Sequence, residues 1–319
     1  MAPGSPDRTI WIDGEWVAWD AARVHLLSHS HQRGSLVFDY LSVHETTRGT
    51  AVFRLPDHVG RFLESCRLVG LPQEFDAGAI FRAVCQTVAT NPGSTAVKIC
   101  AYLPSVEVDV VPLDTHVALA ISAYDPIRDI IAGKPNAPRT GPELRLRIER
   151  QVRNRRADII PAQAKVAANY VAPMIAKWRA QQEGYDEVVM LDEEGHLSEA
   201  PTTNLFLVDA NRVVCTPSTE RVLPGITRRS VIELAKHDGF EVREGTLLPG
   251  ELDSAAEVFL TGTSAGVWPV ISVDGRDVAD GSVGPITSAL KDHFRRVVKG
   301  QDDAFQHWLT PVAEGGEGR

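Results

Sequence analysis

Residues 160–174 read I-P-A-Q-A-K-V-A-A-N-Y-V-A-P-M, and residues 184–206 read G-Y-D-E-V-V-M-L-D-E-E-G-H-L-S-E-A-P-T-T-N-L-F. Four polar residues stand out in these two segments. Lys165 precedes Tyr170 by five positions, and Glu199 precedes Asn204 by five. A long amphipathic segment separates the two pairs. The ordered set, rather than any single member, carries most of the information in the chain.

Lys165 lies between Ala164 and Val166 and has no acidic neighbour in the sequence. A lysine in apolar surroundings loses its proton more readily, because burial disfavours the ammonium form. A neutral amine is the group that forms an imine with a carbonyl cofactor. Taken alone, however, Lys165 is better described as an ordinary surface lysine at the start of a helix.

Length and composition are those of a soluble globular protein. The chain has 319 residues, of which 43% are hydrophobic and 24% charged, enough for two domains and a large core. The net charge of −9 argues against nucleic acid or anionic membrane as a partner. No apolar run approaches the roughly 20 residues of a membrane helix, and the start does not resemble a signal peptide. Four dispersed cysteines indicate reduced thiols in a cytoplasmic enzyme.

The first part of the chain predicts one small α/β domain over residues 1–123. Two short apolar runs flank Asp13-Gly14, which favours a hairpin. Residues 37–43 and 51–55 predict a second strand pair. Pro56 starts a helix that continues to about Gly70, residues 76–89 form another, and strands cover residues 96–102 and 116–122.

Proline and glycine then dominate residues 124–142, which predicts a linker between domains. Residues 143–319 form the expected second domain. It starts with a strand at L-R-L-R-I and continues with a helix over residues 166–183, capped by Gly184. Further helices are expected over residues 226–238 and 286–298, and the tail from Thr310 is expected to be loose.

Several segments together resemble the pyridoxal-phosphate transaminases of fold type IV. They are A-K-V-A-A-N-Y, G-Y-D-E-V-V-M-L-D, L-S-E-A-P-T-T-N-L-F, L-P-G-I-T-R and F-L-T-G-T-S-A-G-V, with D-G-E-W-V and H-V-G-R-F-L-E-S near the start. The family includes branched-chain amino acid aminotransferases, D-amino acid transaminases, (R)-amine transaminases and aminodeoxychorismate lyase. The resemblance implies a small N-terminal α/β domain and a larger C-terminal α/β pseudo-barrel domain. It also implies an active site between the domains, completed by a second subunit of a homodimer or higher homo-oligomer.

The resemblance assigns three catalytic residues. Lys165 would hold pyridoxal 5′-phosphate covalently, and Glu199 would face the pyridine nitrogen, where a carboxylate favours the protonated, electron-withdrawing ring. Tyr170 would hydrogen-bond the phenolic oxygen of the cofactor. Without the resemblance, we would interpret Glu199 as a solvated surface carboxylate and Tyr170 as a half-buried aromatic residue of a helix.

The resemblance also assigns the remaining cofactor contacts. Arg61 would bind the phosphate through its planar guanidinium, although an arginine on the polar face of a helix is an ordinary feature. L-P-G-I-T-R-R opens a helix, and unpaired N–H groups at a helix N-terminus bind phosphate well. The residues assigned to the phosphate, the pyridine face and the substrate carboxylate are Leu223, Ile226, Thr227, Thr263 and Ser264.

Two other readings compete with this one. G-T-S-A-G fits the nucleophile elbow of serine hydrolases, with Ser264 followed by Asp274 and His293, but V-W-P-V-I-S-V then reads as a strand where the elbow needs a helix. One loose motif weighs less than several ordered segments. The histidines of H-L-L-S-H-S-H, at positions 25, 29 and 31, have no cysteine or carboxylate beside them, so we expect no metal site there.

The substrate is the least constrained feature. The large-domain motifs resemble branched-chain aminotransferases most, which implies amino transfer between a hydrophobic amino acid and a 2-oxo acid. The small-domain pocket departs from them, with Arg33 in place of a tyrosine, Ser42 in place of an arginine, and Lys98 in a strand where the family has Y-x-R. F-D-Y-L-S-V, which contains Phe38, resembles (R)-amine and D-amino acid transaminases, and this leaves such an activity as the alternative. Arg33 or Lys98 could bind the substrate carboxylate.

Overall fold

The computed structural model describes residues 6–132, 134, 141–156 and 158–313. The chain forms two compact units. The first comprises Met1–Pro138, Ala164–Ala168 and Val297–Arg319, and the second comprises Arg139–Gln163 and Asn169–Arg296. The sequence placed residues 143–319 in one continuous domain. Two short segments of that range group with the first unit instead, because each pairs with one of its strands.

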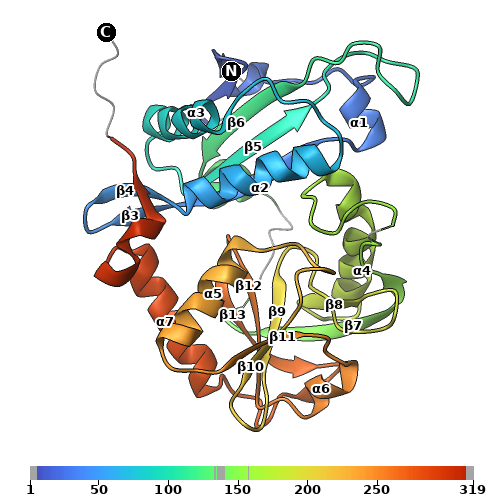
Figure 1. Cartoon of the computed structure of the whole chain (residues 1–319), viewed down its shortest axis with the longest axis vertical. Coiled ribbons are helices and arrows are strands. Elements are labelled where there is room, and N and C mark those ends of the chain that lie inside the picture. The colour runs from blue at the N-terminus through green and yellow to red at the C-terminus, as the bar shows by residue number, and fades with distance from the viewer. Residues whose placement is uncertain (1–5, 133, 135–140, 157, 314–319) are drawn as a thin grey trace. The chain divides into compact units, whose positions relative to one another are not determined.

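The first unit is built on a seven-stranded sheet whose neighbouring strands are antiparallel (Figure 1). The strand order is β15-β4-β3-β5-β6-β1-β2. The predicted hairpin at Asp13-Gly14 is confirmed, and both residues have the positive φ, 49° and 97°, that its turn requires. The elements of this unit are β1 Thr9–Ile12, β2 Glu15–Ala18, η1 Trp19–Ala21, α1 His29–Arg33, β3 Val37–Thr46, β4 Gly49–Phe53, α2 Leu55–Leu68, α3 Ala77–Thr90, β5 Ala96–Tyr102, β6 Ala118–Tyr124, η2 Pro126–Ile131, η4 Asp303–Trp308 and β15 Leu309–Pro311.

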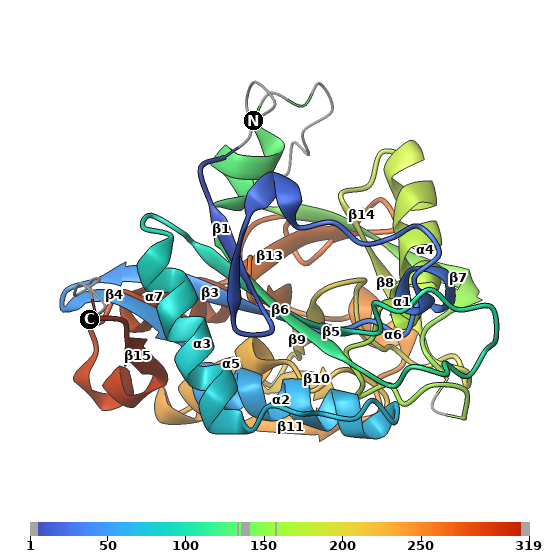
Figure 2. The same cartoon turned by 90° about the horizontal axis from the view of Figure 1, so that it is seen from above.

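Helices α2 and α3 pack on the sheet of this unit, α2 on β3 and α3 on β1 and β6 (Figure 2). The strands alternate accordingly. In β5, Val97 and Ile99 are fully buried, whereas Lys98, Cys100 and Tyr102 on the opposite face are half-buried. The sheet therefore has one closed apolar face and one face that remains partly open.

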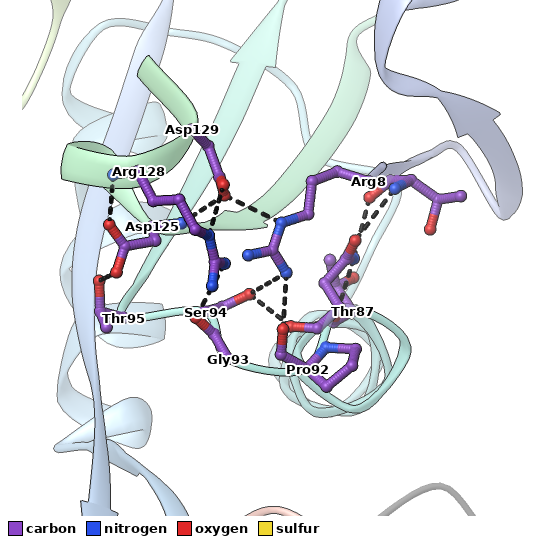
Figure 3. A network of polar contacts seen from close by, with 11 residues as sticks. Arg8, Thr87, Pro92, Gly93, Ser94, Thr95, Asp125, Arg128 and Asp129 are labelled. Atoms are coloured by element: carbon purple, nitrogen blue, oxygen red, sulfur yellow. Dashed lines mark hydrogen bonds and ion pairs between the residues drawn. The ribbon is translucent and has the colours of Figure 1, made fainter. Parts of the chain in front are cut away.

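Part of the predicted linker is folded. Residues 126–131 form a short π-helical turn, η2, whose start is capped by the carboxylate of Asp125. Asp129 of this turn accepts a hydrogen bond of 2.9 Å from Nε of Arg8, and both side chains are buried (Figure 3). Arg8 also donates to the carbonyl of Pro92. Residues 126–131 of the predicted linker are thus folded against the first unit, because Asp129 pairs with Arg8, a residue 121 positions away.

The tail is ordered beyond Thr310. Strand β15 pairs antiparallel with β4, and the guanidinium of Arg54 lies 3.9 Å from the ring centre of Trp308. The aromatic ring and the strand pairing hold this segment, so a loose tail is the wrong prediction for residues 310–312. Residues 314–319 lie outside the described residues.

The second unit contains a mixed eight-stranded sheet in the order β11-β10-β9-β12-β13-β7-β8, with β14 paired to β13 (Figure 1). Its core includes Leu205, Leu207, Val258 and Leu260, and the rings of Phe206 and Phe259 stack at 4.9 Å. Helix α5 packs on β12 and α4 on β8. The elements are β7 Leu144–Arg153, η3 Ala167–Tyr170, α4 Val171–Gln182, β8 Glu187–Leu191, β9 Asn204–Val208, β10 Val214–Pro217, α5 Ile226–His237, β11 Val242–Gly245, α6 Pro249–Asp253, β12 Glu257–Gly262, β13 Gly266–Val273, β14 Arg276–Asp277 and α7 Pro285–Val298. The first two residues of η3 and the last two of α7 group with the first unit.

The helix predicted over residues 166–183 begins later than expected. Its α-helical part is α4, which starts at Val171, and the residues before it form the 3₁₀ turn η3. Val166 instead forms an antiparallel bridge with Val37. The N–H groups of Ala167 and Ala168 donate to carbonyls at positions 36 and 34, which ties these residues to the segment before β3. The expected cap Gly184 does have a positive φ of 88°.

Among the described residues, no helix combines the length and the apolar character needed to cross a membrane. The four cysteines, Cys66, Cys85, Cys100 and Cys215, are free thiols.

Candidate active site

The main chain of Lys165 is held on both sides within the first unit. Its N–H donates to Oγ of Ser65 at 3.1 Å, and its carbonyl accepts from the N–H of Phe38 at 3.0 Å. The side chain is buried, and Nζ lies 4.9 Å from the centre of the Phe38 ring. Nζ of Lys98 lies at the same distance from that ring. The structure thus brings three predicted residues together: Lys165, Phe38 and Lys98.

Arg61 comes from α2, one turn before Ser65. Its Nε and Nη2 donate to the carboxylate of Asp39 at 2.9 and 2.8 Å, a bidentate ion pair whose two side chains are 8% and 0% exposed. The resemblance predicts that this guanidinium binds two oxygens of a phosphate at once. The Nε–Nη2 edge of the guanidinium is therefore occupied by Asp39 in this structure.

Glu199 is buried in the second unit and its carboxylate has three kinds of donor. Arg155 forms an ion pair with it at 3.0 Å. The N–H of Leu223 donates to both oxygens at 3.2 and 3.3 Å, and Nδ2 of Asn204 donates at 3.0 Å. These donors favour the ionised form, the form that can pair with a protonated ring nitrogen.

Arg155 also lies over the ring of Tyr170, with its guanidinium carbon 5.0 Å from the ring centre. One buried arginine therefore contacts two predicted catalytic residues, Glu199 and Tyr170. Its Nε is buried without a hydrogen-bond partner in the described part of the chain, an arrangement that suits the border of a polar ligand. Arg155 is not among the residues predicted from the sequence, because no local pattern marks it. Asn204 is marked in the sequence by its position five residues after Glu199.

The start of α5 lies directly beside Asn204. A Cβ on Gly225 would come within 2.0 Å of Oδ1 of Asn204, so only glycine fits at this position. Asn204 also donates to the carbonyl of Leu223. Ile226 and Thr227 follow as the first helical residues, both are buried, and no side chain caps the helix. The N–H groups of the first turn have no partner within a helix, which is the arrangement that binds phosphate.

Thr263 and Ser264 form the tight turn between β12 and β13. Strand β12 ends where the neighbouring β9 begins, and a Cβ on Gly262 would come within 2.7 Å of Thr203. The turn, the start of α5 and the Glu199–Asn204 segment thus share one end of the sheet. All seven predicted residues of this unit belong to these segments or to η3: Tyr170, Glu199, Leu223, Ile226, Thr227, Thr263 and Ser264.

The hydrolase reading does not agree with this geometry. The turn leads into strand β13 and not into a helix. Asp274 pairs with Arg150 at 2.7 Å, and His293 pairs with Asp238 at 2.8 Å, so the two supposed partners of Ser264 are engaged elsewhere.

Arg33 and His29, one of the three clustered histidines, form hydrogen bonds with the loop that follows β5. Arg33 donates to the carbonyl of Val108 at 2.8 Å, and Nε2 of His29 lies 2.9 Å from the carbonyl of Val110. A group with metal-ligand geometry occurs elsewhere among the described residues, at Asp192, Glu194 and His196. Nη1 of Arg221 lies 2.8 Å from both carboxylates of that group. A cation of the protein itself therefore already occupies the position between these carboxylates.

Each unit contains residue types that can bind parts of pyridoxal 5′-phosphate. The first unit contains a buried amine and an arginine. The second, taken by itself, contains a buried carboxylate, a tyrosine and a helix N-terminus beside Gly225, where a Cβ would crowd Asn204. An aldehyde, a phosphate and a pyridine nitrogen are the groups that such residues bind.

Comparison with known proteins gives one consistent result. Residues 36–273 match the family model of amino-transferase class IV. The branched-chain-amino-acid aminotransferase of Salmonella typhimurium is 33% identical over 308 residues, which cover 95% of this chain and 97% of the relative. The Escherichia coli enzyme of the same name superposes with a TM-score of 0.87 at 30% identity, covering 97% of this chain and 100% of that chain. The branched-chain amino acid aminotransferase of Thermobaculum terrenum, in its form with pyridoxal 5′-phosphate, gives a TM-score of 0.85 at 29% identity, covering 97% and 99%.

Proposed function

Because this chain belongs to the class IV aminotransferases, we propose that it transfers an amino group from a hydrophobic, branched-chain L-amino acid to a 2-oxo acid. The observation that carries the proposal is similarity to branched-chain aminotransferases at 30–34% identity over more than nine-tenths of the chain. Class IV aminotransferases use pyridoxal 5′-phosphate, which supplies an electron sink for the carbanion at the substrate Cα when bound.

The residues of this chain take the remaining roles. Lys165 would hold the cofactor through its amine and would move the proton at the substrate Cα. Glu199 binds the ring nitrogen, and Tyr170 binds the phenolic oxygen. The phosphate is bound by Arg61 together with the set Ile226, Thr227, Thr263 and Ser264, and Leu223 packs on the ring.

Lys98 is the better candidate for the substrate carboxylate. Nζ of Lys98 and Nζ of Lys165 each lie 4.9 Å from the Phe38 ring centre, so the two nitrogens are separated by less than about 10 Å. An ammonium at that distance from the reacting amine can reach a carboxylate of a bound substrate. Arg33, the other candidate, binds the loop after β5 instead.

The open sheet face offers room for a hydrophobic side chain. A cavity of about 440 Å³ on this face is lined by apolar residues such as Ile10, Ile12 and Leu36, and also by the polar side chains of Arg23, His31 and Tyr102. Phe38 stands opposite Cys100, one of the lining residues, in the strand register. A cavity of this size that combines apolar walls with several polar side chains is typical of a small-molecule site.

A donor panel tests the substrate proposal. L-leucine, L-valine, L-glutamate, D-alanine and (R)-1-phenylethylamine are assayed with 2-oxoglutarate and with pyruvate as acceptors. We expect L-leucine or L-valine to be a good donor. Activity confined to D-alanine or to the (R)-amine would contradict the proposal. Lys98→Met should raise KM for L-leucine about tenfold and Lys98→Arg should restore it, whereas Arg33→Met should change it less. An unchanged KM in Lys98→Met would refute the role of Lys98.

We also propose that the chain works as a homodimer in the cytoplasm. Exposed apolar side chains support the first point: Val108 is 95% and Leu113 is 93% exposed, and Val171, Met174 and Trp178 line one side of α4. The four free thiols support the second.

A further inference from the structure

Arg155 follows strand β7 by two residues, and its neighbour Asn154 fixes this segment to the one that carries Glu199. The N–H of Asn154 donates to the carbonyl of Leu191 at 2.8 Å, and its Nδ2 donates to Oγ of Ser198 at 2.7 Å. Both Asn154 and Ser198 are buried. Because Ser198 directly precedes Glu199, the main chains that carry Arg155 and Glu199 are held beside each other by uncharged groups.

The guanidinium of Arg155 contacts one carboxylate and one aromatic ring inside the second unit. Its Nη1 lies 3.0 Å from Oε1 of Glu199 and donates to the carbonyl of Ala162 at 3.3 Å. Its carbon lies 5.0 Å from the centre of the Tyr170 ring. The side chains of Arg155 and Glu199 are 3% and 4% exposed, so solvent screens their charges little. A further cation that binds Glu199 must therefore share the carboxylate with Arg155.

The carboxylate of Glu199 also has neutral donors. The N–H of Leu223 donates to both oxygens at 3.2 and 3.3 Å, and Nδ2 of Asn204 donates to Oε2 at 3.0 Å. Such hydrogen bonds favour the ionised form of a carboxylate without adding a positive charge. Arg155 adds a full positive charge on the Oε1 side. The neutral donors thus leave the negative charge of Glu199 available to a second cation, whereas Arg155 balances it.

We propose that Arg155 is a positioning residue that limits how firmly the cofactor ring holds its nitrogen proton. It fixes the carboxylate of Glu199 and balances part of its negative charge, which weakens the attraction of that carboxylate for a protonated ring nitrogen. The inference rests on the proposed function, in which Glu199 binds the ring nitrogen. A merely structural role gives the opposite expectation, because a carboxylate displaced by the loss of Arg155 would hold the ring proton less firmly. The direction of the effect separates the two roles.

Arg155 and Glu199 then act in opposite directions on the electron sink that the cofactor supplies. Glu199 favours the protonated ring, which withdraws electrons from the substrate Cα. Arg155 favours the unprotonated ring, which withdraws fewer. The two residues together set an intermediate strength.

The experiment follows the ring nitrogen itself. Holoenzyme is prepared with pyridoxal 5′-phosphate that carries nitrogen-15 in the ring, and the chemical shift of this nitrogen is titrated from about pH 6 to about pH 9. Arg155→Gln removes the charge but keeps an N–H donor. We expect its midpoint to lie about one pH unit above that of the unaltered protein, about tenfold in proton affinity. Arg155→Lys keeps the charge and should return the midpoint to within about half a unit.

Lys177→Gln is the matched control. Lys177 of α4 also forms an ion pair with a buried carboxylate of the second unit, that of Glu187 in β8, which is 2% exposed. This variant removes the same charge from the same unit and should leave the midpoint unchanged within about half a unit. If Arg155→Gln does not fold, Arg155→Lys is measured alone, and its midpoint decides the question.

Four outcomes would overturn the inference. They are a midpoint of Arg155→Gln that is lowered or is raised by less than about half a unit, a midpoint of Arg155→Lys that moves by more than that, a shift in Lys177→Gln as large as in Arg155→Gln, and a ring nitrogen that stays fully protonated over the whole range in the unaltered protein. Failure of the proposed function looks different. In that case the unaltered protein would bind no pyridoxal 5′-phosphate, or Glu199→Gln would not move the midpoint to lower pH.

Discussion

At Lys165 the main chain is fixed before the side chain enters any chemistry. Two backbone hydrogen bonds, to Ser65 and from Phe38, hold the residue, and neither depends on its amine. Removing the amine as Lys165→Ala should therefore leave the fold intact. We expect the visible absorbance of the lysine-bound cofactor and the transamination activity to be lost together, with an unchanged circular dichroism spectrum. Multiple turnovers by a well-folded Lys165→Ala protein would refute the assignment.

Arg155 and Glu199 form a second residue-scale test, because both side chains are buried, 3% and 4% exposed. Breaking a buried ion pair from one side leaves an unpaired charge and costs about 3–5 kcal/mol. Arg155→Met should lower the free energy of unfolding by that amount. Glu199→Gln should also lower the rate of the proton-transfer half-reaction by about one to two powers of ten. The double variant should be less destabilised than the sum of the single variants.

Urea unfolding and single-turnover kinetics measure both effects. Arg150→Met is the control, because its ion pair with Asp274 involves a side chain that is 60% exposed, and such pairs contribute about 1 kcal/mol or less. Additive stability losses in the Arg155 and Glu199 variants would show that the two residues are not coupled.

At the scale of elements, local patterns predicted most of the fold. The hairpin at Asp13-Gly14 and helices α2, α3 and α5 follow from turn residues, proline positions and apolar spacing, which act within a few residues. Local patterns failed where a distant strand decides the structure. Val166 lies within a helical pattern, but the main chain around it pairs with residues 34–38, more than a hundred positions earlier.

The candidate site divides in the same way. Three residues of the site could be predicted because they lie in recognisable sequence motifs: Lys165, Tyr170 and Glu199. Asp39 and Arg155 could not, because each gains its role from a partner on another element, Arg61 on α2 and Glu199 after β8. The sequence spacing of a carboxylate in a strand or of an arginine in a loop does not predict such ion pairs.

A buried histidine in strand β3 makes the free energy of unfolding fall at acidic pH. Burial lowers the pKa of His44 to about 4, below its ordinary 6.5, and the ring lies 2.9 Å from Oγ of Ser42. The unfolded chain therefore binds more protons than the folded chain between these values. The contribution of His44 is fully present above pH 6.5 and is lost as the pH falls toward 4, by up to about 3 kcal/mol. The lowered pKa of His58 acts in the same direction.

His44→Gln cannot take up a proton and should lose less stability than the unaltered protein between pH 7 and 4. Free energies of unfolding from urea titrations at several pH values measure the difference, and His25→Gln, at an exposed position, is the matched control. If His44→Gln and the unaltered protein lose stability in parallel, His44 is not the group responsible.

At the scale of the whole molecule, exposed apolar side chains predict association. We define the valine loop as residues 106–113, in which Val106, Val108, Val110, Val111 and Leu113 are 56–95% exposed. Arg33 and His29 hold the backbone of this loop through its carbonyls, so the loop is fixed while its apolar side chains face outward. Ordered apolar surface of this kind marks an interaction site. We therefore expect the protein to sediment as a dimer at micromolar concentration.

Val108→Asp combined with Leu113→Asp should shift sedimentation toward the monomer, because a charge cannot be buried at an apolar interface without a partner. The side chains changed are 95% and 93% exposed, so the fold of each subunit should not suffer. Leu248→Asp, at an apolar position of the second unit that is 54% exposed, is the control and should remain dimeric. If a second subunit completes each active site, transaminase activity should fall in proportion to the monomer fraction. A valine-loop variant that is monomeric and fully active would limit the interface to assembly, and one that remains dimeric would place the interface elsewhere.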